Sequence, residues 1–215
     1  HDVVKHKSIS LLGDAKVSVK LILERINNFH ISKQYQTEIN RLKNLWEADV
    51  VRVTSKSDKN SLPSDSEVIG AVNRNVTKDT IVIGAAGSMP GELHKLWKSG
   101  DVEGYHMEYG FSCMGYEIPA AIGVNLAEPD RPNVIFVGDG SYMMMNSELS
   151  TAVMMGISTT IIVTDNRGFG CINRLQKSTG SEPFNNLFKD SHHQKLPNID
   201  SVSYTHLTLP TTVSV

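Results

Sequence analysis

Asp139 and Asn166 each follow shortly after an apolar run that has the length of a β-strand. These runs are residues 134–137 and 160–163, and the stretch between them has the pattern of one helix. Two parallel strands joined by a helix place their carboxyl ends at the same edge of a sheet. A carboxylate and a carboxamide there can share one Mg²⁺, which takes oxygen ligands and usually also binds a phosphate. The spacing therefore predicts a metal and phosphate site.

Glycines flank the candidate metal ligand Asp139. Gly138 and Gly140 allow a sharp turn of the backbone and a close approach to a ligand. The N–H groups of Gly140 and Ser141, at the start of the next helix, can face a phosphate. A Gly-Asp-Gly turn without any ligand is the alternative interpretation, and the matching position of Asn166 favours the ligand site.

The segment 138–141, followed at this interval by Asn166, resembles the metal-diphosphate motif of thiamine-diphosphate-dependent enzymes. The resemblance implies that Asp139, Asn166 and the main-chain carbonyl of Gly168 bind Mg²⁺. The family usually has Asn-Asn where this chain has Asp165 followed by Asn166, so the departure falls on the position that is not a ligand.

The same resemblance assigns residues to thiamine diphosphate. Backbone N–H groups and the Ser88 hydroxyl suit phosphate oxygens, and Met114 matches the bulky apolar residue that holds the cofactor bent. The catalytic Glu of the family belongs to an N-terminal domain that we do not expect in this chain, so no catalytic residue is expected here. The cofactor-binding residues implied in this way are Ala86, Gly87, Ser88, Met89, Met114, Gly138, Gly140, Ser141, Asn166, Gly168 and Phe169.

Three longer segments, 84–91, 105–117 and 168–173, resemble a narrower group within that family, the trihydroxycyclohexane-dione hydrolases of myo-inositol catabolism. This resemblance covers residues 10–200. It implies a hydrolase that opens the ring of trihydroxycyclohexane-1,2-dione to 5-deoxy-glucuronate. A polyhydroxylated cyclic dione needs hydrogen-bonding partners, although a surface or structural role is the alternative for each candidate. The candidates are His106, Glu108, Tyr109, Glu117 and Asn173.

Two other functions share the metal motif. An acetolactate-synthase-like enzyme or a 2-oxoacid decarboxylase would have the same Gly-Asp-Gly turn, and residues 108–110 and 168–171 are what favours the dione hydrolase. A nonenzymatic diphosphate-binding module would use only the strand-end turns. For the enzyme, the resemblance implies a homo-oligomer in which a second subunit supplies the pyrimidine-binding domain, so the chain alone is expected to be inactive.

The composition indicates a globular protein. Of the 215 residues, 40% are hydrophobic and 20% are charged, which suits a domain with a real core. A net charge of −2 gives no reason to expect nucleic acid or an anionic membrane as partner. No run of apolar residues is long enough to predict a membrane span. The two cysteines do not form a disulfide framework, which fits a reducing cytoplasm.

Alternating strand and helix patterns predict an α/β fold, a doubly wound parallel sheet with helices on both faces, truncated at its C-terminal end. The predicted domains are a remnant of a preceding middle domain (1–30), a linker helix and loop (31–64), the thiamine diphosphate and Mg²⁺ domain (65–200) and a non-native tail (201–215). Helices are predicted at 17–26, 33–49, 64–76, 115–127 and 143–156, a strand at 80–83 and a loop at 84–91. The methionines of 143–156 are expected to fill the core.

Overall fold

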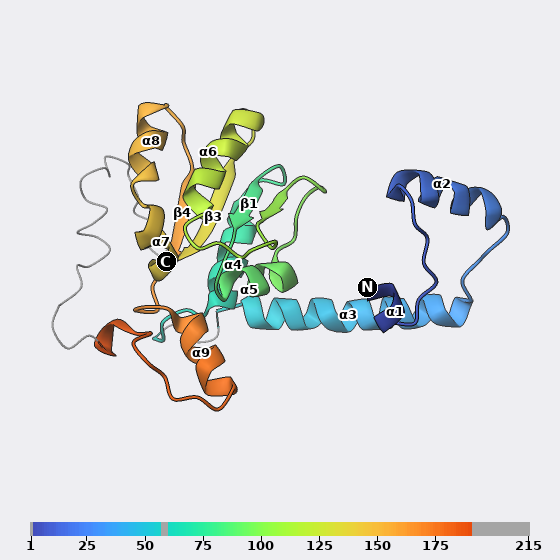
Figure 1. Cartoon of the computed structure of the whole chain (residues 1–215), viewed down its shortest axis with the longest axis horizontal. Coiled ribbons are helices and arrows are strands. Elements are labelled where there is room, and N and C mark those ends of the chain that lie inside the picture. Colours follow the sequence, from blue (N-terminus) through green and yellow to red (C-terminus); the bar gives the residue numbers. More distant parts are fainter. Residues whose placement is uncertain (1, 57–59, 191–215) are drawn as a thin grey trace. The chain divides into compact units, whose positions relative to one another are not determined.

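The computed structural model describes residues 2–56 and 60–190 of the chain (Figure 1). Internal contacts divide the chain into two units, residues 1–49 and 50–215. The division falls inside the segment 31–64 that was predicted as a linker. The predicted tail and the last part of the predicted cofactor domain lie outside the described residues. Within those described ranges, none of the helices combines the length and the apolar character needed to cross a membrane.

The first unit contains helices α1 (Asp2–Lys5) and α2 (Ala15–Arg25) and most of α3 (Lys33–Thr54). Helix α2 is capped by Asp14, whose Oδ1 accepts a hydrogen bond from the N–H of Val17 at 2.9 Å. Helices α2 and α3 confirm the predicted elements, although α3 continues to Thr54 rather than ending at residue 49. None of the residues 3–49 is buried, so their apolar faces have no core of their own.

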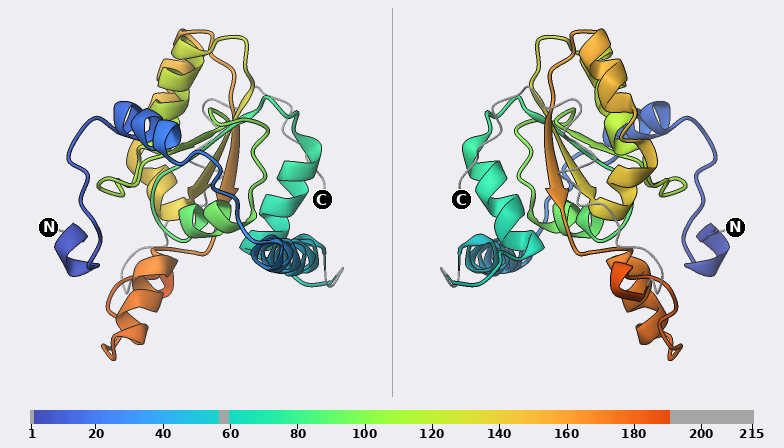
Figure 2. Two further views of the ribbon diagram at one scale, coloured as in Figure 1. Left: turned by 90° about the vertical axis from the view of Figure 1, so that its right-hand side faces the viewer. Right: turned by 90° about the vertical axis from the view of Figure 1, so that its left-hand side faces the viewer.

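The second unit is built on a parallel sheet of four strands in the order β2-β1-β3-β4. Residue Ile135 of β3 pairs with Ile83 of β1 on one side and with Ile161 of β4 on the other. The strands are β1 (Ile81–Gly84), β2 (Tyr105–Met107), β3 (Asn133–Gly138) and β4 (Thr160–Thr164). Figure 2 shows helices on both sides of this sheet. The predicted α/β class with a parallel sheet is therefore confirmed.

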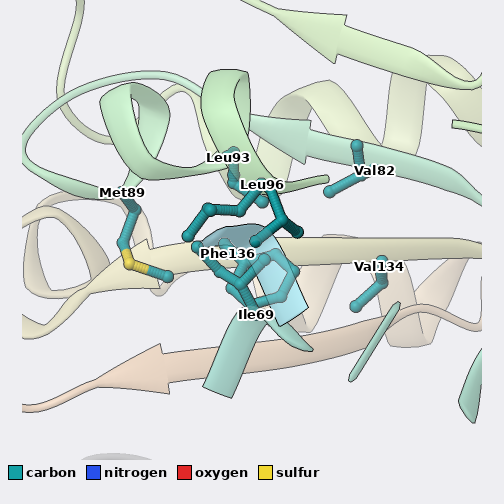
Figure 3. Packing of buried hydrophobic residues seen from close by; sticks show 8 residues of the cluster. Ile69, Val82, Met89, Leu93, Leu96, Val134 and Phe136 are labelled. Carbon is teal, nitrogen blue, oxygen red and sulfur yellow. The ribbon is translucent and has the colours of Figure 1, made fainter. Parts of the chain in front are cut away.

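One face of the sheet packs against helices α4 (Asp65–Asn75) and α5 (Met89–Leu96). Because side chains alternate along a strand, Val82, Val134 and Phe136 all point to this face. Figure 3 shows the packing around Phe136. The helical residues of this cluster are Val50 of α3, Ile69 of α4 and Met89, Leu93 and Leu96 of α5.

The other face packs against α6 (Glu117–Ala127), α7 (Asp139–Met145) and α8 (Glu148–Met154). The intervening strand residues, among them Ile83, Ile135 and Val137, join Ile118 of α6 and Tyr142 of α7 in a second buried cluster. With apolar side chains buried on both faces, β1 and β3 form the centre of the core and hold the strand ends in place. The described chain ends with α9 (Gly170–Ser178) and the short 3₁₀ helix η1 (Phe188–Asp190).

The predicted start of α4 is confirmed in detail. The N–H of Ser64 donates to Glu67 Oε2 at 2.7 Å, and the N–H of Glu67 donates to Ser64 Oγ at 3.3 Å. This reciprocal pair is a capping box, which satisfies two backbone donors that a helix start leaves open.

Three predictions about helices were wrong. The single helix expected between β3 and β4 is two helices, α7 and α8, separated at Asn146 and Ser147. Both residue types compete with the backbone for hydrogen bonds, which favours a turn over a continuous helix. The methionines there are not core residues: Met144 is 49% exposed and Met154 81% exposed, while Met143 alone is packed against the core. Finally, the predicted loop 84–91 already contains the first turn of α5.

Candidate functional site

A cleft of about 280 Å³ lies where the segments after β1, β3 and β4 meet. In a parallel sheet the carboxyl ends of the strands are where ligands bind. Every residue predicted to bind the cofactor lines this cleft: Ala86, Gly87, Ser88, Met89, Met114, Gly138, Gly140, Ser141, Asn166, Gly168 and Phe169. The structure therefore brings together residues from four separate stretches of the sequence.

The cleft also has lining residues that the sequence interpretation missed. They are Ser112, Thr164, Gly170, Cys171, Ile172 and Leu175. Several belong to α9, which was not predicted as a helix. The apolar spacing of Ile172 and Leu175, three residues apart, is the signal that could have indicated a helix face directed at the cleft.

Asp139 is the first residue of α7 and is completely buried. Its Oδ2 accepts a hydrogen bond from the N–H of Gly168 at 2.8 Å. Burial raises the pKa of this carboxyl, the Gly168 hydrogen bond acts in the opposite direction, and the nearby charge of Asp165 adds to the rise. The carboxylate is thus held between the end of β3 and the loop after β4, as the spacing of Asp139 and Asn166 predicts.

The second oxygen of Asp139, Oδ1, is buried and has no hydrogen-bond partner among the described residues. A buried polar atom without a partner is costly, and a cation bound at Oδ1 would remove that cost. The described residues contain no cluster of three His, Cys, Asp or Glu side chains that could hold a metal. The expected donors are instead one carboxylate, one amide and one carbonyl, an all-oxygen set that suits Mg²⁺. The residues present therefore fit the metal that the sequence predicts.

The loop that carries Asn166 and Gly168 is held by the segment 186–188. The N–H of Phe169 donates to the carbonyl of Asn186 at 2.7 Å, and the N–H of Phe188 donates to the carbonyl of Arg167 at 2.9 Å. Gly168 has φ of 142°, a conformation that favours glycine. A Cβ there would lie 2.5 Å from the carbonyl oxygen of Asn186, so a larger residue cannot take its place without a shift.

Asp165, the residue that departs from the usual Asn-Asn pattern, has a local role. Its Oδ1 accepts a hydrogen bond from the N–H of Arg167 at 3.0 Å, and its Oδ2 lies 3.1 Å from Nε of the same residue. The side chain is exposed, and these contacts stay within the loop. The departure therefore changes how the turn is held and adds a negative charge near Asp139.

The segment after β1 forms the opposite side of the cleft. Gly87 has φ of 94°, and the space where its Cβ would stand is open. The hydroxyl of Ser88 donates to Asp65 Oδ2 at 3.4 Å, a long bond that points it toward the start of α4. The side chain of Met89 is buried in the core, so at this position the backbone rather than the side chain is available to a ligand.

The family described as thiamine pyrophosphate enzyme, C-terminal TPP binding domain, matches residues 85–206, which is more than half of the chain. The chain belongs to this family. The matched range includes Asp139 and every residue that lines the cleft.

Several curated relatives carry the name 3D-(3,5/4)-trihydroxycyclohexane-1,2-dione hydrolase. The one from Clostridium tetani is 39% identical over 208 residues, covering 86% of this chain and 32% of the relative. Those from Clostridium perfringens strain 13 and Geobacillus thermodenitrificans are 38% and 37% identical, covering 79% and 86% of this chain and 30% and 32% of the relatives. The chain therefore spans about a third of the length of the curated relatives it matches.

Within the described part of this family member, none of the five predicted substrate residues lines the cleft. His106 lies beside Tyr116, with Nε2 2.8 Å from the Tyr116 hydroxyl and the two rings stacked. Both residues line a separate hollow against α6. The Tyr109 hydroxyl is 3.2 Å from that of Tyr105, and its ring is exposed.

The remaining candidates are also engaged elsewhere. Glu108 accepts hydrogen bonds from the N–H groups of Phe111 and Cys113, each at 2.8 Å, and these bonds hold the pKa of its carboxyl below the usual value. Asn173 is buried in α9, and its Oδ1 has no partner among the described residues. Glu117 is buried and bonded to Ser141, a residue of the cleft.

Proposed function

We propose that this chain is the diphosphate-binding part of a hydrolase that opens the ring of trihydroxycyclohexane-1,2-dione to 5-deoxy-glucuronate in myo-inositol catabolism. The names of the relatives support the reaction, and the family supports the cofactor. The proposal further places the whole enzyme in the cytoplasm as a homo-oligomer.

The observation that carries the metal part of the proposal is the unpaired, buried Oδ1 of Asp139. We assign Mg²⁺ to this oxygen, to the Asn166 side chain and to the carbonyl of Gly168. Two negative partners, the Asp139 carboxylate and a diphosphate, would then share the positive charge of one ion. This arrangement would tie the ligand to the end of β3.

Thiamine diphosphate, when bound, supplies the carbon nucleophile that attacks a carbonyl and stores the resulting negative charge. The residues of this chain bind and orient. Backbone N–H groups of the segments 86–89 and 140–141 would face the diphosphate, and Met114, half-buried at the cleft, would support the cofactor sterically. The hydroxyls of the dione would find partners in the complete enzyme.

We expect the 215-residue chain to bind the cofactor without turning over substrate. In the family the catalytic Glu and the pyrimidine-binding surface come from the N-terminal domain of a second subunit. A chain that spans about a third of its relatives would then provide one half of each active site. The partners in this proposal are the cyclic dione and that second subunit, with no nucleic acid and no membrane.

A substrate panel on a full-length enzyme that contains this chain tests the reaction. We expect turnover of trihydroxycyclohexane-1,2-dione and none of pyruvate, in the presence of thiamine diphosphate and Mg²⁺. Turnover of pyruvate but not of the dione would reject the hydrolase in favour of an acetolactate-synthase-like enzyme or a 2-oxoacid decarboxylase. Binding of the cofactor with no turnover of any substrate would favour a binding module.

A further inference from the structure

Glu117, the first residue of α6, is a buried carboxyl for which the proposed function has no use. It is 1% exposed and does not line the cleft. Ionisable side chains are rarely buried so completely unless they are partnered. Burial raises the pKa of this carboxyl, while hydrogen bonds from neighbouring groups act in the opposite direction. The identity of those neighbours indicates what Glu117 does.

The side-chain partner of Glu117 is Ser141, in the first turn of α7. The Ser141 hydroxyl lies 3.0 Å from Oε1 and 2.9 Å from Oε2 of Glu117. The same hydroxyl oxygen accepts a hydrogen bond from the N–H of Gly115 at 2.8 Å. Backbone N–H groups of Ala86, Gly115 and Glu117 itself also favour the charged form of the carboxylate.

These contacts decide where the hydroxyl proton of Ser141 goes. The N–H of Gly115 can only donate, so the Ser141 oxygen is the acceptor in that bond. Its one proton is then directed to Glu117, which as a carboxylate can only accept. The Ser141 hydroxyl is therefore not free to donate to a ligand in the cleft, and the backbone N–H of Ser141 is the donor that remains.

The three segments that meet at Glu117 are the same segments that border the cleft. Ala86 follows β1, Gly115 follows Met114, and Ser141 stands two residues after Asp139. The turn at Gly115 also packs tightly on α7. It has φ of 85°, and a Cβ there would lie 2.7 Å from Cγ of Met145.

We propose that Glu117 is a positioning residue of the cofactor site, whose buried carboxylate joins the Met114 turn to the start of α7 through Ser141, beside the Ala86 segment, in one fixed arrangement. It acts through Ser141 and the backbone, without touching the ligand. The inference rests on the proposed function only for the identity of that ligand. The network of hydrogen bonds itself belongs to the ligand-free protein.

A purely space-filling role predicts a different result from a positioning role. Replacing a buried, hydrogen-bonded charge by an apolar residue of similar volume is often neutral or stabilising. If Glu117 only fills space, Glu117→Leu keeps both stability and cofactor affinity. If it positions the three segments, stability is kept or raised while affinity falls, because the turn and the helix lose the group that joins them.

The test uses the 215-residue chain and its Glu117→Leu and Glu117→Gln variants. Gln keeps the shape of the side chain and one acceptor oxygen, but its NH2 group would replace the other acceptor by a donor. Titration calorimetry with thiamine diphosphate at fixed Mg²⁺ should show affinity reduced at least tenfold in both variants, and Glu117→Leu should keep an unchanged or higher apo melting temperature. Glu128→Gln, an exposed Glu at the other end of α6, is the matched control and should change neither. Unchanged affinity in Glu117→Leu, or a loss of affinity that only follows a loss of folded protein, would overturn the proposal.

A second readout needs no ligand. Hydrogen exchange of the Gly115 amide, followed by NMR, should be slow in the wild-type chain and accelerated in both Glu117→Gln and Ser141→Ala. The double variant should exchange no faster than Ser141→Ala, since the two residues act through one bond. If the wild-type chain binds no thiamine diphosphate, the proposed function fails, while this measurement still decides the network. Fast exchange at Gly115 in the wild-type chain would refute the role of Glu117.

Discussion

Two buried carboxylates lie next to residues that line the cleft, and they differ in whether a buried oxygen is left without a hydrogen-bond partner. Asp139, at the end of β3, has one oxygen bonded to the N–H of Gly168 and one buried oxygen without a partner among the described residues. Glu117, at the start of α6, has both oxygens within hydrogen-bonding distance of Ser141. Burial raises the pKa of both.

The difference separates a binding group from a positioning group. A protein that leaves a buried acceptor unpaired has a stability cost that a ligand can remove, so the free oxygen of Asp139 marks a place for a cation. Glu117 has no such unpartnered oxygen, because both of its oxygens lie next to the Ser141 hydroxyl. Burial and a perturbed pKa alone would not distinguish the two roles, whereas the presence or absence of a buried oxygen without a partner does.

Asp139→Ala should have the largest effect on the affinity for thiamine diphosphate. A small effect would contradict the distinction between Asp139 as a binding group and Glu117 as a positioning group. We expect the Mg²⁺-dependent affinity for thiamine diphosphate to fall at least 100-fold, about 2.7 kcal/mol, because the ion loses its only carboxylate. The free energy of unfolding of the ligand-free chain should fall by no more than about 1–3 kcal/mol, because the N–H of Gly168 loses its acceptor while the cost of the unpaired oxygen Oδ1 is removed. Calorimetry with and without Mg²⁺ measures the first and urea unfolding the second.

The control for this variant is Asp130→Asn. Asp130 is exposed and lies in the turn that precedes β3, at the amino end of the strands. It should leave both affinity and stability unchanged. Binding that persists in Asp139→Ala with undiminished dependence on Mg²⁺ would contradict the metal assignment.

Gly168→Ala should disturb the one hydrogen bond that Asp139 has. The new Cβ would meet the Asn186 carbonyl in a conformation that L-residues rarely adopt, so we expect a loss of about 1–3 kcal/mol in the free energy of unfolding. Gly180→Ala is the matched comparison, because φ is 81° there but the Cβ would stand in open space. Its loss should be about 1 kcal/mol, measured by urea unfolding. Equal losses would show that the contact with Asn186 is unimportant.

The pH dependence of stability should distinguish Glu117 from the exposed Glu108. A raised folded-state pKa gives stability that is complete below the unfolded value, 4.5, and is lost as the pH rises through the folded value. Relative to wild type, Glu117→Gln should therefore gain stability as the pH rises above about 4.5, with a slope below about 1.4 kcal/mol per pH unit. Urea unfolding at a series of pH values measures this.

Glu108→Gln should show the opposite sign. The pKa of Glu108 is lowered by hydrogen bonds from Phe111 and Cys113, so its contribution is present above the unfolded value and lost as the pH falls through the folded one. The variant should lose stability relative to wild type on going from acid to neutral pH. Parallel curves for the two variants would contradict the assigned directions.

The smallest effect is expected at the other serine–carboxyl pair, Ser64 and Glu67. Here the Ser64 hydroxyl lies 2.9 Å from Glu67 Oε2 at the start of α4. Ser64→Ala should cost about 1 kcal/mol of unfolding free energy, the usual value for a lost helix cap, and should leave cofactor affinity unchanged. Ser158→Ala, an exposed serine outside any helix, is the control. A drop in cofactor affinity for Ser64→Ala would show that a local helix cap also affects the cofactor site, and would contradict the distinction between this cap and the Glu117 network.

The two serine–carboxyl pairs also show what a sequence reveals. Ser64 and Glu67 are three residues apart, so the capping box and the start of α4 are predictable from local spacing. Ser141 and Glu117 are 24 residues apart and meet because α6 and α7 pack together on one face of the sheet. The break between α7 and α8 and the exposure of Met144 and Met154 escaped prediction for a related reason. Methionines stand at consecutive positions, 143–145 and 154–155, so the pattern there does not show which side of each helix meets the core.

The sequence by itself determined the parallel α/β class, most of the main helices and strands, and eleven of the residues that line the cleft. These follow from periodicity, caps and strand-end motifs, which act over short distances along the chain. Only the tertiary structure decided that Asp139 keeps a buried oxygen without a partner while Glu117 does not, and that none of the predicted substrate residues lines the cleft. Those outcomes depend on which groups the register of the sheet brings into contact, and no local pattern encodes that register.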